Sequence, residues 1–397
     1  MDILAEISQV TAFMVAPLAL YLGGLALLAR RRHPAVSSGA PRWRLTVVVP
    51  AHNEEKGIAA TVASLRSVSY PRNLWRLVVV ADNCQDNTAV VAARAGAMVW
   101  CRQDELRQGK GYALTYAFAR LLRENTCDAV VVVDADTSVS PNLLRALATR
   151  LEGGEKVLQG SYGVRNPHAS WRTALMTVAL ATFHDVRSLA REALGLSAGL
   201  RGNGMCFAID VLREVPHRAF GLVEDVEYGI VLGRAGYRVA FVAEARVLGE
   251  MASGSRASAS QRQRWEGGRW ALARQHFVGL LCQGLKRRNA MLLDLAMDLA
   301  LPPLGYLWCC IVLGLSFEVA SAWQRDSLTF AGVLWGLSFM AVVIYVLRGV
   351  QLSDLGARGY RALAWAPVYV LWKMALLLPV GPRSSAWIRT SREQERA

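Results

Sequence analysis

The sequence predicts an α/β domain, with a mostly parallel sheet covered by helices on both faces, together with helices in a membrane. Three observations lead to this fold class. Short apolar runs alternate with helix-like segments between residues 44 and 249, which is typical of parallel strands joined by covering helices. Polar residues follow several of these runs. Longer apolar stretches lie outside this region, and 53% of the 397 residues are hydrophobic, a high share for a wholly soluble chain.

The alternation can be assigned element by element. We expect strands at 45–49, 75–81, 97–100 and 129–133, and helices at 54–68, 88–95 and 111–123. Ligands in open α/β sheets bind beyond the carboxyl ends of the strands. The loops that follow the predicted strands are therefore the first place to look for a site.

The first long apolar stretch predicts a membrane anchor. Residues 10–29 form an unbroken uncharged run, which is long enough to cross a hydrocarbon core of roughly 30 Å. Asp2 and Glu6 precede this run, and three arginines follow it at 30–32. A cleavable signal peptide would carry positive charge before its apolar run, and basic residues favour the cytosolic side of a span. We therefore expect an uncleaved anchor, with the following domain in the cytosol.

Three more apolar stretches lie towards the C-terminal end. Residues 299–317 and 328–347 predict a transmembrane hairpin, and its link at 318–327 suits the outer face. Residues 362–380 contain Pro367 and Lys373, so they predict either a fourth span or a helix in the interface. We expect a multi-pass protein of the inner cell membrane with an anchor at 1–32, the α/β domain at 43–255, basic interfacial helices at 256–298, the hairpin at 299–347, the ambiguous segment at 362–380 and a basic tail at 381–397.

Charge and cysteine content narrow the choice of partners. The formal net charge is +14, and much of it flanks the predicted spans, where it fits an anionic membrane surface. We therefore expect no nucleic-acid partner. The seven cysteines show no C-x-x-C spacing, which argues against a cysteine metal site and against a disulfide framework.

Polar residues follow three of the predicted strands. They are Pro50, His52, Asn53 and Glu54 after the first strand, Asp82 after the second, and Asp134 and Asp136 after the strand at 129–133. An Asp-x-Asp at a strand end can simply begin a turn. Alternatively, its carboxylates are hard oxygen ligands for Mg²⁺ or Mn²⁺, ions that keep positions open for substrate phosphates. Three such loops at one sheet edge favour a shared site.

Four further clusters hold candidate residues. Lys110 precedes a predicted helix, where an ammonium and a helix N-terminus favour the same anion, although a solvated loop lysine is the alternative. Residues 202–207 form a small-residue turn. Residues 223–227 hold three carboxylates, which also suit the first turn of a helix. Residues 261–265 begin a basic stretch that is typical of an amphipathic helix at a membrane surface.

Taken in order, PAHNEE, DNCQDNT, GKG, DAD, RGNG, EDVE and QRQRW resemble the motifs of the membrane-bound family 2 glycosyltransferases. Relatives in that family include the cellulose, hyaluronan and chitin-oligosaccharide synthases. The resemblance covers residues 45–270 and implies a GT-A fold, which is Rossmann-like, a nucleotide-sugar donor and inversion of the anomeric carbon. Asn83 departs from the acid or glycine of many relatives, and Val223 departs from the threonine of the cellulose synthases.

The resemblance also implies roles for the matched residues. Pro50, His52, Asn53, Glu54 and Asp82 would contact the nucleobase and ribose, Lys110 would lie near the nucleotide, Asp134 would touch the ribose side, and Asp136 would hold the Mg²⁺ or Mn²⁺ that bridges the diphosphate. Asp225 would be the general base. Glu224, Gln261, Arg264 and Trp265 would lie near the diphosphate and the acceptor.

These residues predict an inverting transferase that moves a sugar from a UDP-sugar to a hydroxyl of a lipid-linked or saccharide acceptor at the cytosolic membrane face. The alternatives are a processive polysaccharide synthase, transfer to a polyprenyl phosphate, which needs no base, and a non-catalytic nucleotide-sugar receptor. The predicted spans are too few to enclose a polymer channel, which favours a short or lipid-linked product. We expect the amphipathic stretches 171–194 and 265–281 to lie on the membrane beside the site.

Overall fold

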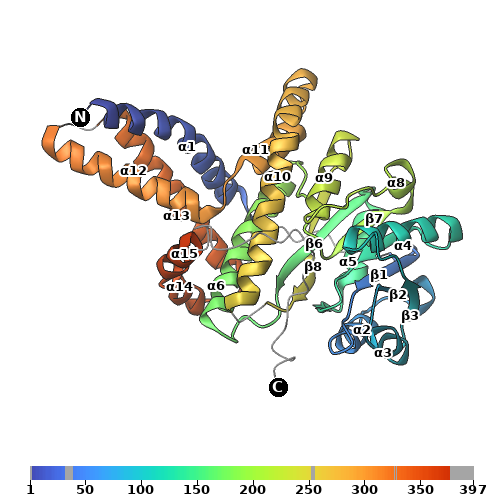
Figure 1. Cartoon of the computed structure of the whole chain (residues 1–397). Helices are drawn as coiled ribbons and strands as arrows, with labels where there is room; N and C mark the ends of the chain where they lie inside the picture. Colours follow the sequence, from blue (N-terminus) through green and yellow to red (C-terminus); the bar gives the residue numbers. More distant parts are fainter. Residues whose placement is uncertain (1, 32–38, 252–254, 326, 328, 376–397) are drawn as a thin grey trace.

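The computed structural model describes residues 2–31, 39–251, 255–325, 327 and 329–375. These residues form an α/β domain that packs beside a group of long helices (Figure 1). Helices α10 (Ser255–Arg287) and α11 (Ala290–Ala300) lie between these two parts. The expected combination of a mixed α/β domain and apolar helices is therefore confirmed.

The strands of the domain form an eight-stranded sheet in the described residues, in the order β3-β2-β1-β4-β7-β6-β8-β5. Their bounds are β1 Leu45–Ala51, β2 Trp75–Asp82, β3 Met98–Arg102, β4 Ala129–Val132, β5 Thr137–Val139, β6 Val157–Val164, β7 Met205–Ala208 and β8 Val239–Gly249. Strands β3, β2, β1 and β4 are parallel, as predicted, and so are β6 and β8. Strand β7 runs antiparallel to both of its neighbours, so the sheet as a whole is mixed.

The antiparallel strand β7 has a direct consequence for the site. Val132 of β4 pairs with Met205 of β7, so the turn before β7 lies beside the carboxyl end of β4. The amide of Gly204 donates to the carbonyl of Val132 at 2.9 Å. Residues 202–204 and Asp134 are thus neighbours, although about seventy positions separate them in the chain.

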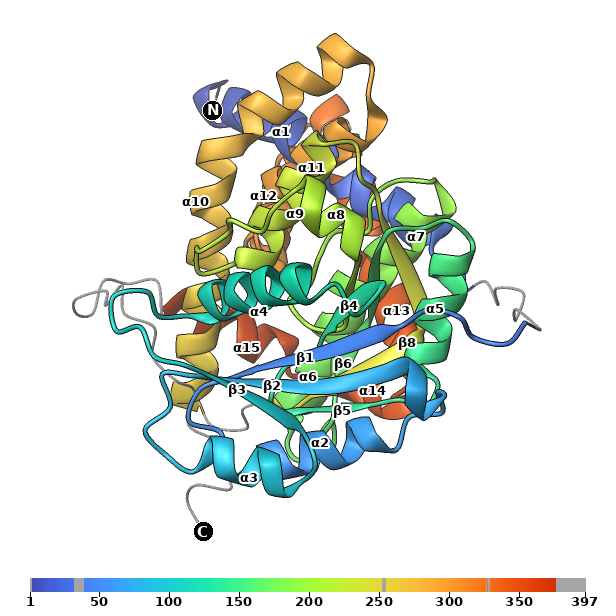
Figure 2. The ribbon, with the colours of Figure 1, turned by 90° about the vertical axis from the view of Figure 1, so that its right-hand side faces the viewer.

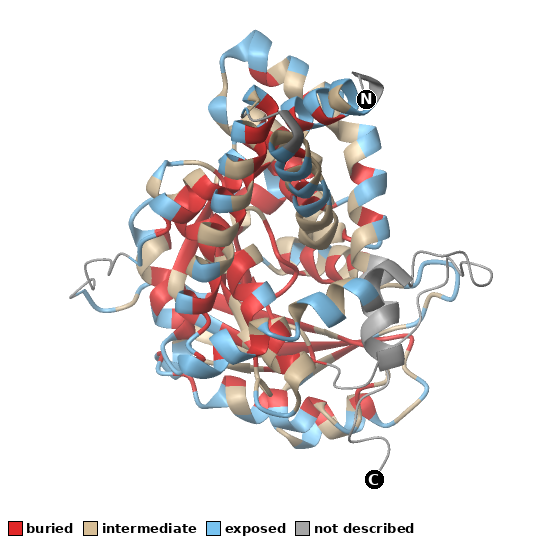
Figure 3. Cartoon of the chain, turned by 90° about the vertical axis from the view of Figure 1, so that its left-hand side faces the viewer, coloured by how far each residue is buried: buried red, intermediate tan, exposed pale blue. Residues whose placement is uncertain are grey.

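Helices cover both faces of the sheet. Helices α2 (Ile58–Arg66) and α3 (Thr88–Arg94) lie on one side and α4 (Lys110–Glu124) lies on the other (Figure 2). The remaining helices of the domain are α5 Leu143–Glu152, α8 Ile209–Glu214 and α9 Glu224–Arg234. Helix α2 begins four residues later than the predicted start at 54. Glu54 lies in a turn before the helix, where its backbone amide donates to the Thr88 hydroxyl. Buried residues follow the sheet, and exposed ones cover the outer helix surfaces (Figure 3).

Three described helices are long and apolar enough to cross a membrane: Leu4–Leu28, Leu304–Trp323 and Phe330–Leu352. They belong to α1 (Asp2–Leu28), α12 (Leu304–Arg325) and α13 (Phe330–Leu352). The second span begins later than the predicted 299, because Pro302 and Pro303 separate α11 from α12. Prolines interrupt a helix by removing donors.

Helices α1 and α13 run side by side in the same direction. Near their starts, Trp335 Nε1 donates to Ser8 Oγ at 3.1 Å. Near their ends, Arg348 donates to the carbonyl of Ala29. A Cβ added to Gly23 would lie 2.8 Å from the Cβ of Ala341, which shows the close backbone approach that small residues allow between membrane helices. The ends of both helices that lead to the α/β domain therefore lie on the same side.

Residues 318–325, which we expected in the link between two spans, belong to helix α12 in the structure. Glu318 lies inside α12 and is 4% exposed. Its carboxylate accepts from the hydroxyls of Ser8 at 2.7 Å and Thr329 at 2.6 Å. A buried carboxylate needs such partners, and they hold it between helices instead of in a surface loop.

The expectation that residues 171–194 lie on a membrane surface was wrong for most of the stretch. Helix α6 (Trp171–Leu180), the π-helical segment η2 (Ala181–Val186) and α7 (Arg187–Ala193) continue one another. Val186 and Ala190 are fully buried with residues of α1 and α13. The charged residues on this stretch suggested a surface, but they form ion pairs inside the junction between domain and helices.

The segment predicted at 362–380 is described as far as residue 375. It contains the end of α14 (Ala357–Leu363) and α15 (Ala366–Ala375). The stacked rings of Trp365 and Trp171, 5.2 Å apart, fix the turn between these helices against α6. The basic tail at 381–397 lies outside the described residues.

Candidate active site

The loops after β1 and β2 are joined by hydrogen bonds into one wall. His52 Nδ1 bonds to the carbonyl of Asp82 at 2.8 Å, and the amide of Gln85 donates to Asn53 Oδ1 at 2.8 Å. Asn53 has a φ of 54°, a left-handed conformation that asparagine tolerates better than most residues. Pro50, His52, Glu54 and Asp82 line a cavity, whereas Asn53 holds the wall together. The structure thus brings these predicted residues together.

Asp82 has a partner that the sequence analysis missed. Its carboxylate lies 2.6 Å from Arg102 at the end of β3, and both side chains are nearly buried. Asp82 and Arg102 are directly paired in the register of β2 and β3. Asn83, with a φ of 50°, donates its amide to the carbonyl of Arg102 and accepts from the amide of Asp104. Asn83, which replaces the acid or glycine of many relatives, therefore forms a tight turn that orients Asp82.

Lys110 is the centre of the site. Its Nζ lies 2.6 Å from Asp134 Oδ1 and 3.6 Å from Glu224 Oε1, and it donates to the carbonyl of Gly202 at 2.5 Å. The side chain is only 23% exposed, so the alternative of a solvated loop lysine does not hold. One ammonium thus connects the loop after β4, the turn before β7 and the start of α9.

The turn before β7 is built to approach these charged groups closely. Gly202 and Gly204 have φ values of 79° and 71°, which favour glycine. A Cβ on Gly202 would lie 3.2 Å from Asp225 Oδ2 and 3.5 Å from Lys110 Nζ. Between the glycines, the fully buried Asn203 accepts from the amide of Asp134 at 3.1 Å. The sequence signalled this turn by its small residues, but it did not indicate that Asn203 fixes the Asp134 backbone.

The two carboxylates at the start of α9 have altered proton affinities. Burial raises the pKa of Glu224 to about 7, with Lys110 opposing the shift and Asp225 adding to it. Burial also raises the pKa of Asp225, against the lowering effect of Lys110. These residues do occupy the acidic first turn of a helix, as the alternative proposed. Glu227 serves the fold there, since it accepts from the amide of Gly221, while Glu224 and Asp225 line the cavity.

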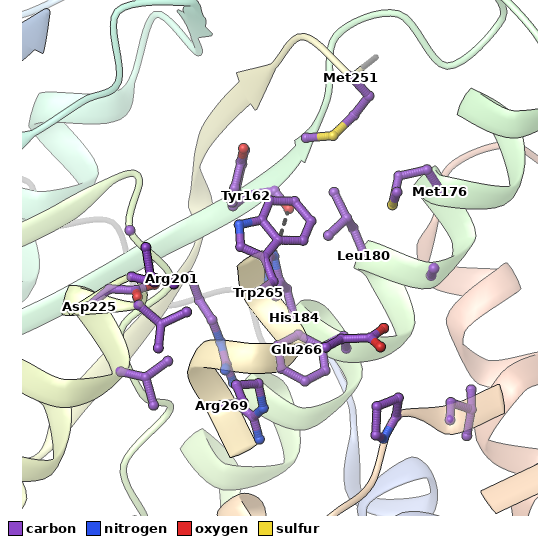
Figure 4. A pocket seen from close by; sticks show the side chains of 18 of the residues that line it. Tyr162, Met176, Leu180, His184, Arg201, Asp225, Met251, Trp265, Glu266 and Arg269 are labelled. Carbon is purple, nitrogen blue, oxygen red and sulfur yellow. Dashed lines mark hydrogen bonds between the residues drawn. The ribbon is translucent and has the colours of Figure 1, made fainter. Parts of the chain in front are cut away.

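Helix α10 carries the QRQRW residues. The side chains of Gln261 and Arg264 lie outside the described residues. Trp265 points into the cavity, in the same view as Asp225 and Arg201 (Figure 4). Arg269, one turn further along the helix, lines the cavity as well, although the sequence analysis did not single it out.

The cavity has a volume of about 1700 Å³ and is continuous from the loops after β1 and β2, past Lys110 and Asp225, to the apolar helices. Residues of α12, α13 and α15 line its far end, among them Trp308, Val342 and Val370. Ligand pockets usually measure ~300–1,000 Å³. This cavity is therefore large enough for two ligands, one at the polar end and one at the apolar end.

The polar end fits a divalent cation that a substrate helps to bind. Asp134 and Asp136 both line the cavity just beyond β4. Within the described part of the chain, no group of three or more His, Cys, Asp or Glu side chains could hold a metal by itself. Mg²⁺ is usually held by one or two carboxylates together with substrate phosphates. The donor set therefore suits a metal that arrives with a diphosphate.

Residues 41–268, more than half of the chain, match the family described as Glycosyltransferase like family 2. An N-acetylglucosaminyltransferase of Sinorhizobium fredii is 26% identical over 360 residues, covering 87% of this chain and 82% of that protein. The probable glycosyltransferase YdaM of Bacillus subtilis is 24% identical over 257 residues. That match covers 60% of this chain and 60% of the Bacillus protein.

Among solved structures, the mannosyltransferase PcManGT of Pyrobaculum calidifontis, in complex with GDP-Man and Mn²⁺, has a similar fold. The two share 18% sequence identity with a TM-score of 0.56, and the match covers 87% of this chain and 97% of that one. At this identity the likeness concerns the fold alone. It includes the flanking helices as well as the sheet, since so little of either chain is left out.

Proposed function

The chain belongs to Glycosyltransferase like family 2, and from this premise we propose that it is a membrane-bound, inverting enzyme that transfers a sugar from a UDP-sugar to an acceptor hydroxyl. The observation that carries the proposal is the contact set of Lys110. Its ammonium joins Asp134, at the donor end of the cavity, to Glu224 and the neighbouring Asp225, at the acceptor end. Such an arrangement places a donor and a base next to one another.

The donor end provides the contacts that a nucleotide needs. The wall formed by Pro50, His52, Glu54 and Asp82 would receive the base and ribose. Asp136 would hold Mg²⁺ or Mn²⁺ together with the diphosphate, and the metal would neutralise charge that develops on the leaving group. Lys110 supports the same task because its pKa is raised by Asp134 and Glu224 against the lowering effect of burial. It therefore remains a cation near the diphosphate.

The acceptor end provides the base. Asp225 lies beside the Gly202 turn and would accept the proton of the acceptor hydroxyl as the new bond to the anomeric carbon forms, a contribution of typically ~100- to 10,000-fold. Burial raises its pKa above the ordinary value, which strengthens it as a base. Direct displacement needs only one carboxylate, acting as the base, and it inverts the anomeric carbon.

The arrangement of α1, α12 and α13 supports a cytosolic catalytic domain. Arg31 follows the end of α1, and Arg348 lies near the end of α13. Basic residues favour the cytosolic side of a span. The segment at 362–380 would then lie in the interface. The apolar end of the cavity suits a lipid-linked acceptor and a short product, with a processive synthase as the second candidate because of the QRQRW residues.

A donor screen tests the proposal. The full chain, purified in lipid nanodiscs, would be incubated with radiolabelled UDP- and GDP-sugars, Mn²⁺ and a membrane lipid extract. We expect sugar transfer from one of the UDP-sugars into one or a few products that mass spectrometry sizes. A product of tens of sugars would favour the processive synthase, and UDP binding without any transfer would favour a receptor.

Topology is tested separately with sealed vesicles. Single cysteines placed at Arg123, which is exposed on α4, and at Asp2, in a background without reactive cysteines, should react from the cytosolic and the outer face respectively. The reverse pattern of labelling would contradict the cytosolic placement.

A further inference from the structure

A cluster of arginines lies beside the cavity beyond Asp225, and three of its members, Arg187, Arg201 and Arg269, line the cavity. Arg187 and Arg191 on α7, Arg201 before β7 and Arg269 on α10 surround Asp294 and Asp298 of α11. The aspartates pair most closely with Arg191, at 2.8 Å in both cases. Asp225 also lies near Arg201, which lowers its pKa, so four arginines face three aspartates and the cluster keeps a formal excess of one positive charge, which is costly at a buried position.

Arg201 and Arg269 are the members of the cluster that line the cavity and keep an unused donor. Arg201 is 8% exposed, and its guanidinium donates to the carbonyl of Ala198 at 3.0 Å. Among the described residues, its buried Nε has no hydrogen-bond partner, and neither has NH1 of Arg269. Burial lowers the pKa of Arg201 to about 10, and the neighbouring arginines contribute to this shift. Buried donors without partners are uncommon in folded proteins, and where they line a cavity they are candidates for contact with a ligand.

Both guanidinium groups, each with one unused donor, line the cavity near the ring of Phe183. Their Cζ atoms lie 4.8 Å (Arg201) and 5.2 Å (Arg269) from the ring centroid. Figure 4 shows Arg201 and Arg269 close together, while Glu266 extends to the other side of the cavity. An anion placed between the two guanidinium groups would satisfy both and would be held by charge-assisted hydrogen bonds.

The apolar end of the cavity begins beyond these arginines. Val312 and Leu313 of α12 line it and are 37% and 71% exposed, so the cavity reaches a surface that membrane lipid would cover. A ligand with an anionic head and an apolar tail would fit both parts of this wall.

We propose that Arg201 and Arg269 form the subsite for an anionic group, a phosphate or carboxylate, on an acceptor whose apolar chain lies among α12, α13 and α15. This inference rests on the proposed function, since it names the class of acceptor. The anion anchors the acceptor so that a hydroxyl elsewhere on the molecule meets Asp225.

Binding of short amphiphiles to the full chain in a neutral detergent tests this subsite. Decyl phosphate is the probe, decanol has the same tail without the charge, and inorganic phosphate has the charge without the tail. We expect decyl phosphate to bind at least about tenfold more tightly than either. Equal binding of decanol would overturn the anionic subsite. Equal binding of inorganic phosphate would overturn the lipid acceptor in favour of a soluble anion.

The variants Arg201→Gln and Arg269→Gln should each reduce the affinity for decyl phosphate about tenfold. Arg274→Gln is the matched control, because Arg274 is exposed on the same helix as Arg269, and it should bind like the parent. Thermal unfolding of each variant checks the fold, and Arg269→Gln is the safer variant because its side chain is 19% exposed. Unchanged affinity in folded variants would overturn the proposal.

UDP affinity in the presence of Mn²⁺ is measured in the same samples. We expect Arg201→Gln and Arg269→Gln to bind UDP like the parent. A parallel loss of UDP binding would assign these arginines to the donor and overturn the acceptor subsite. A parent chain that binds decyl phosphate but neither UDP nor any nucleotide sugar would instead contradict the proposed function and leave the anionic subsite standing.

Discussion

The two ends of the cavity are built in different ways. At the donor end, short loops follow neighbouring strands, and two carboxylates have a counter-charge close by: Asp82 with Arg102, and Asp134 with Lys110. At the junction end, charged residues come from α7, α10, α11 and the turn before β7, and positive charge is in excess. The donor end is thus built from one feature that repeats along the sheet, a polar loop at the carboxyl end of each strand. The junction end exists only after distant segments have packed together.

The largest effect that we expect is a loss of transfer activity, and it concerns Asp225, which lies where the two ends of the cavity meet. Asp225→Asn keeps the shape of the side chain and removes its basicity, so transfer should fall by ~100- to 10,000-fold, while UDP affinity stays near that of the parent. Calorimetry for UDP and a turnover assay give the two quantities. Glu227→Gln, on the same turn of α9, is the control and should remain active. More than about a tenth of the parent rate in Asp225→Asn would remove the residue from the role of base.

The second prediction concerns the junction alone. Asp298→Asn should lower the free energy of unfolding by about 3–5 kcal/mol, because it leaves buried arginines without their counter-charge. Burial alone would raise the pKa of Asp298, but Arg191, Arg269 and Arg187 hold it well below the ordinary value. This contribution to stability is therefore present at neutral pH and is lost as the pH falls through the lowered pKa.

Chemical denaturation in detergent measures the loss in Asp298→Asn. Asp128→Asn is the control, since its ion pair with Arg44 is exposed, and it should leave the midpoint almost unchanged. Similar midpoints for both variants would show that the buried cluster does not hold the junction together.

The third prediction concerns the donor end. Asp136→Ala should reduce the Mn²⁺-dependent affinity for UDP by about tenfold, ~1.4 kcal/mol, because a carboxylate ligand of the metal is lost. Titrations with and without EDTA measure this dependence. Asp210→Ala, at an exposed carboxylate, should behave like the parent. Full transfer activity of the parent after exhaustive EDTA treatment would return the Asp-x-Asp to the role of a turn.

The smallest effect is a shift in pH dependence. Lys110 lowers the pKa of both Glu224 and Asp225, so Lys110→Met should raise both. The base must be deprotonated to act, and the acidic limb of the kcat profile should therefore move to higher pH. Rates at saturating donor from about pH 5 to about pH 9 would show the shift. Lys156→Met, on an exposed ion pair, should give the parent profile, and an identical profile in Lys110→Met would separate Lys110 from the base.

The sequence by itself predicted β1 to β4, the helices between them and the three apolar helices, and it indicated which polar residues would meet beyond the first strands. Apolar periodicity reflects burial, so β1, β2 and β4 were predicted within a few residues, and the polar residues after each strand had to meet at one edge. The roles of Pro50, Glu54 and Asp136 remain predictions, but their position around one cavity is what the strand order required.

Only the tertiary structure decided the partners. Arg102 could be assigned to Asp82 only from the register of β2 and β3, and Asn203 could be placed next to Asp134 only because β7 runs antiparallel to β4. The stretch at 171–194 was wrongly expected at a membrane surface. The arginines of α7 suggested exposure to solvent, whereas in the structure they pair with Asp294 and Asp298 of α11. Apolar periodicity is a local pattern that indicates which residues are buried. Pairing between distant charges depends on how separate elements pack, and no local pattern in a single sequence indicates it.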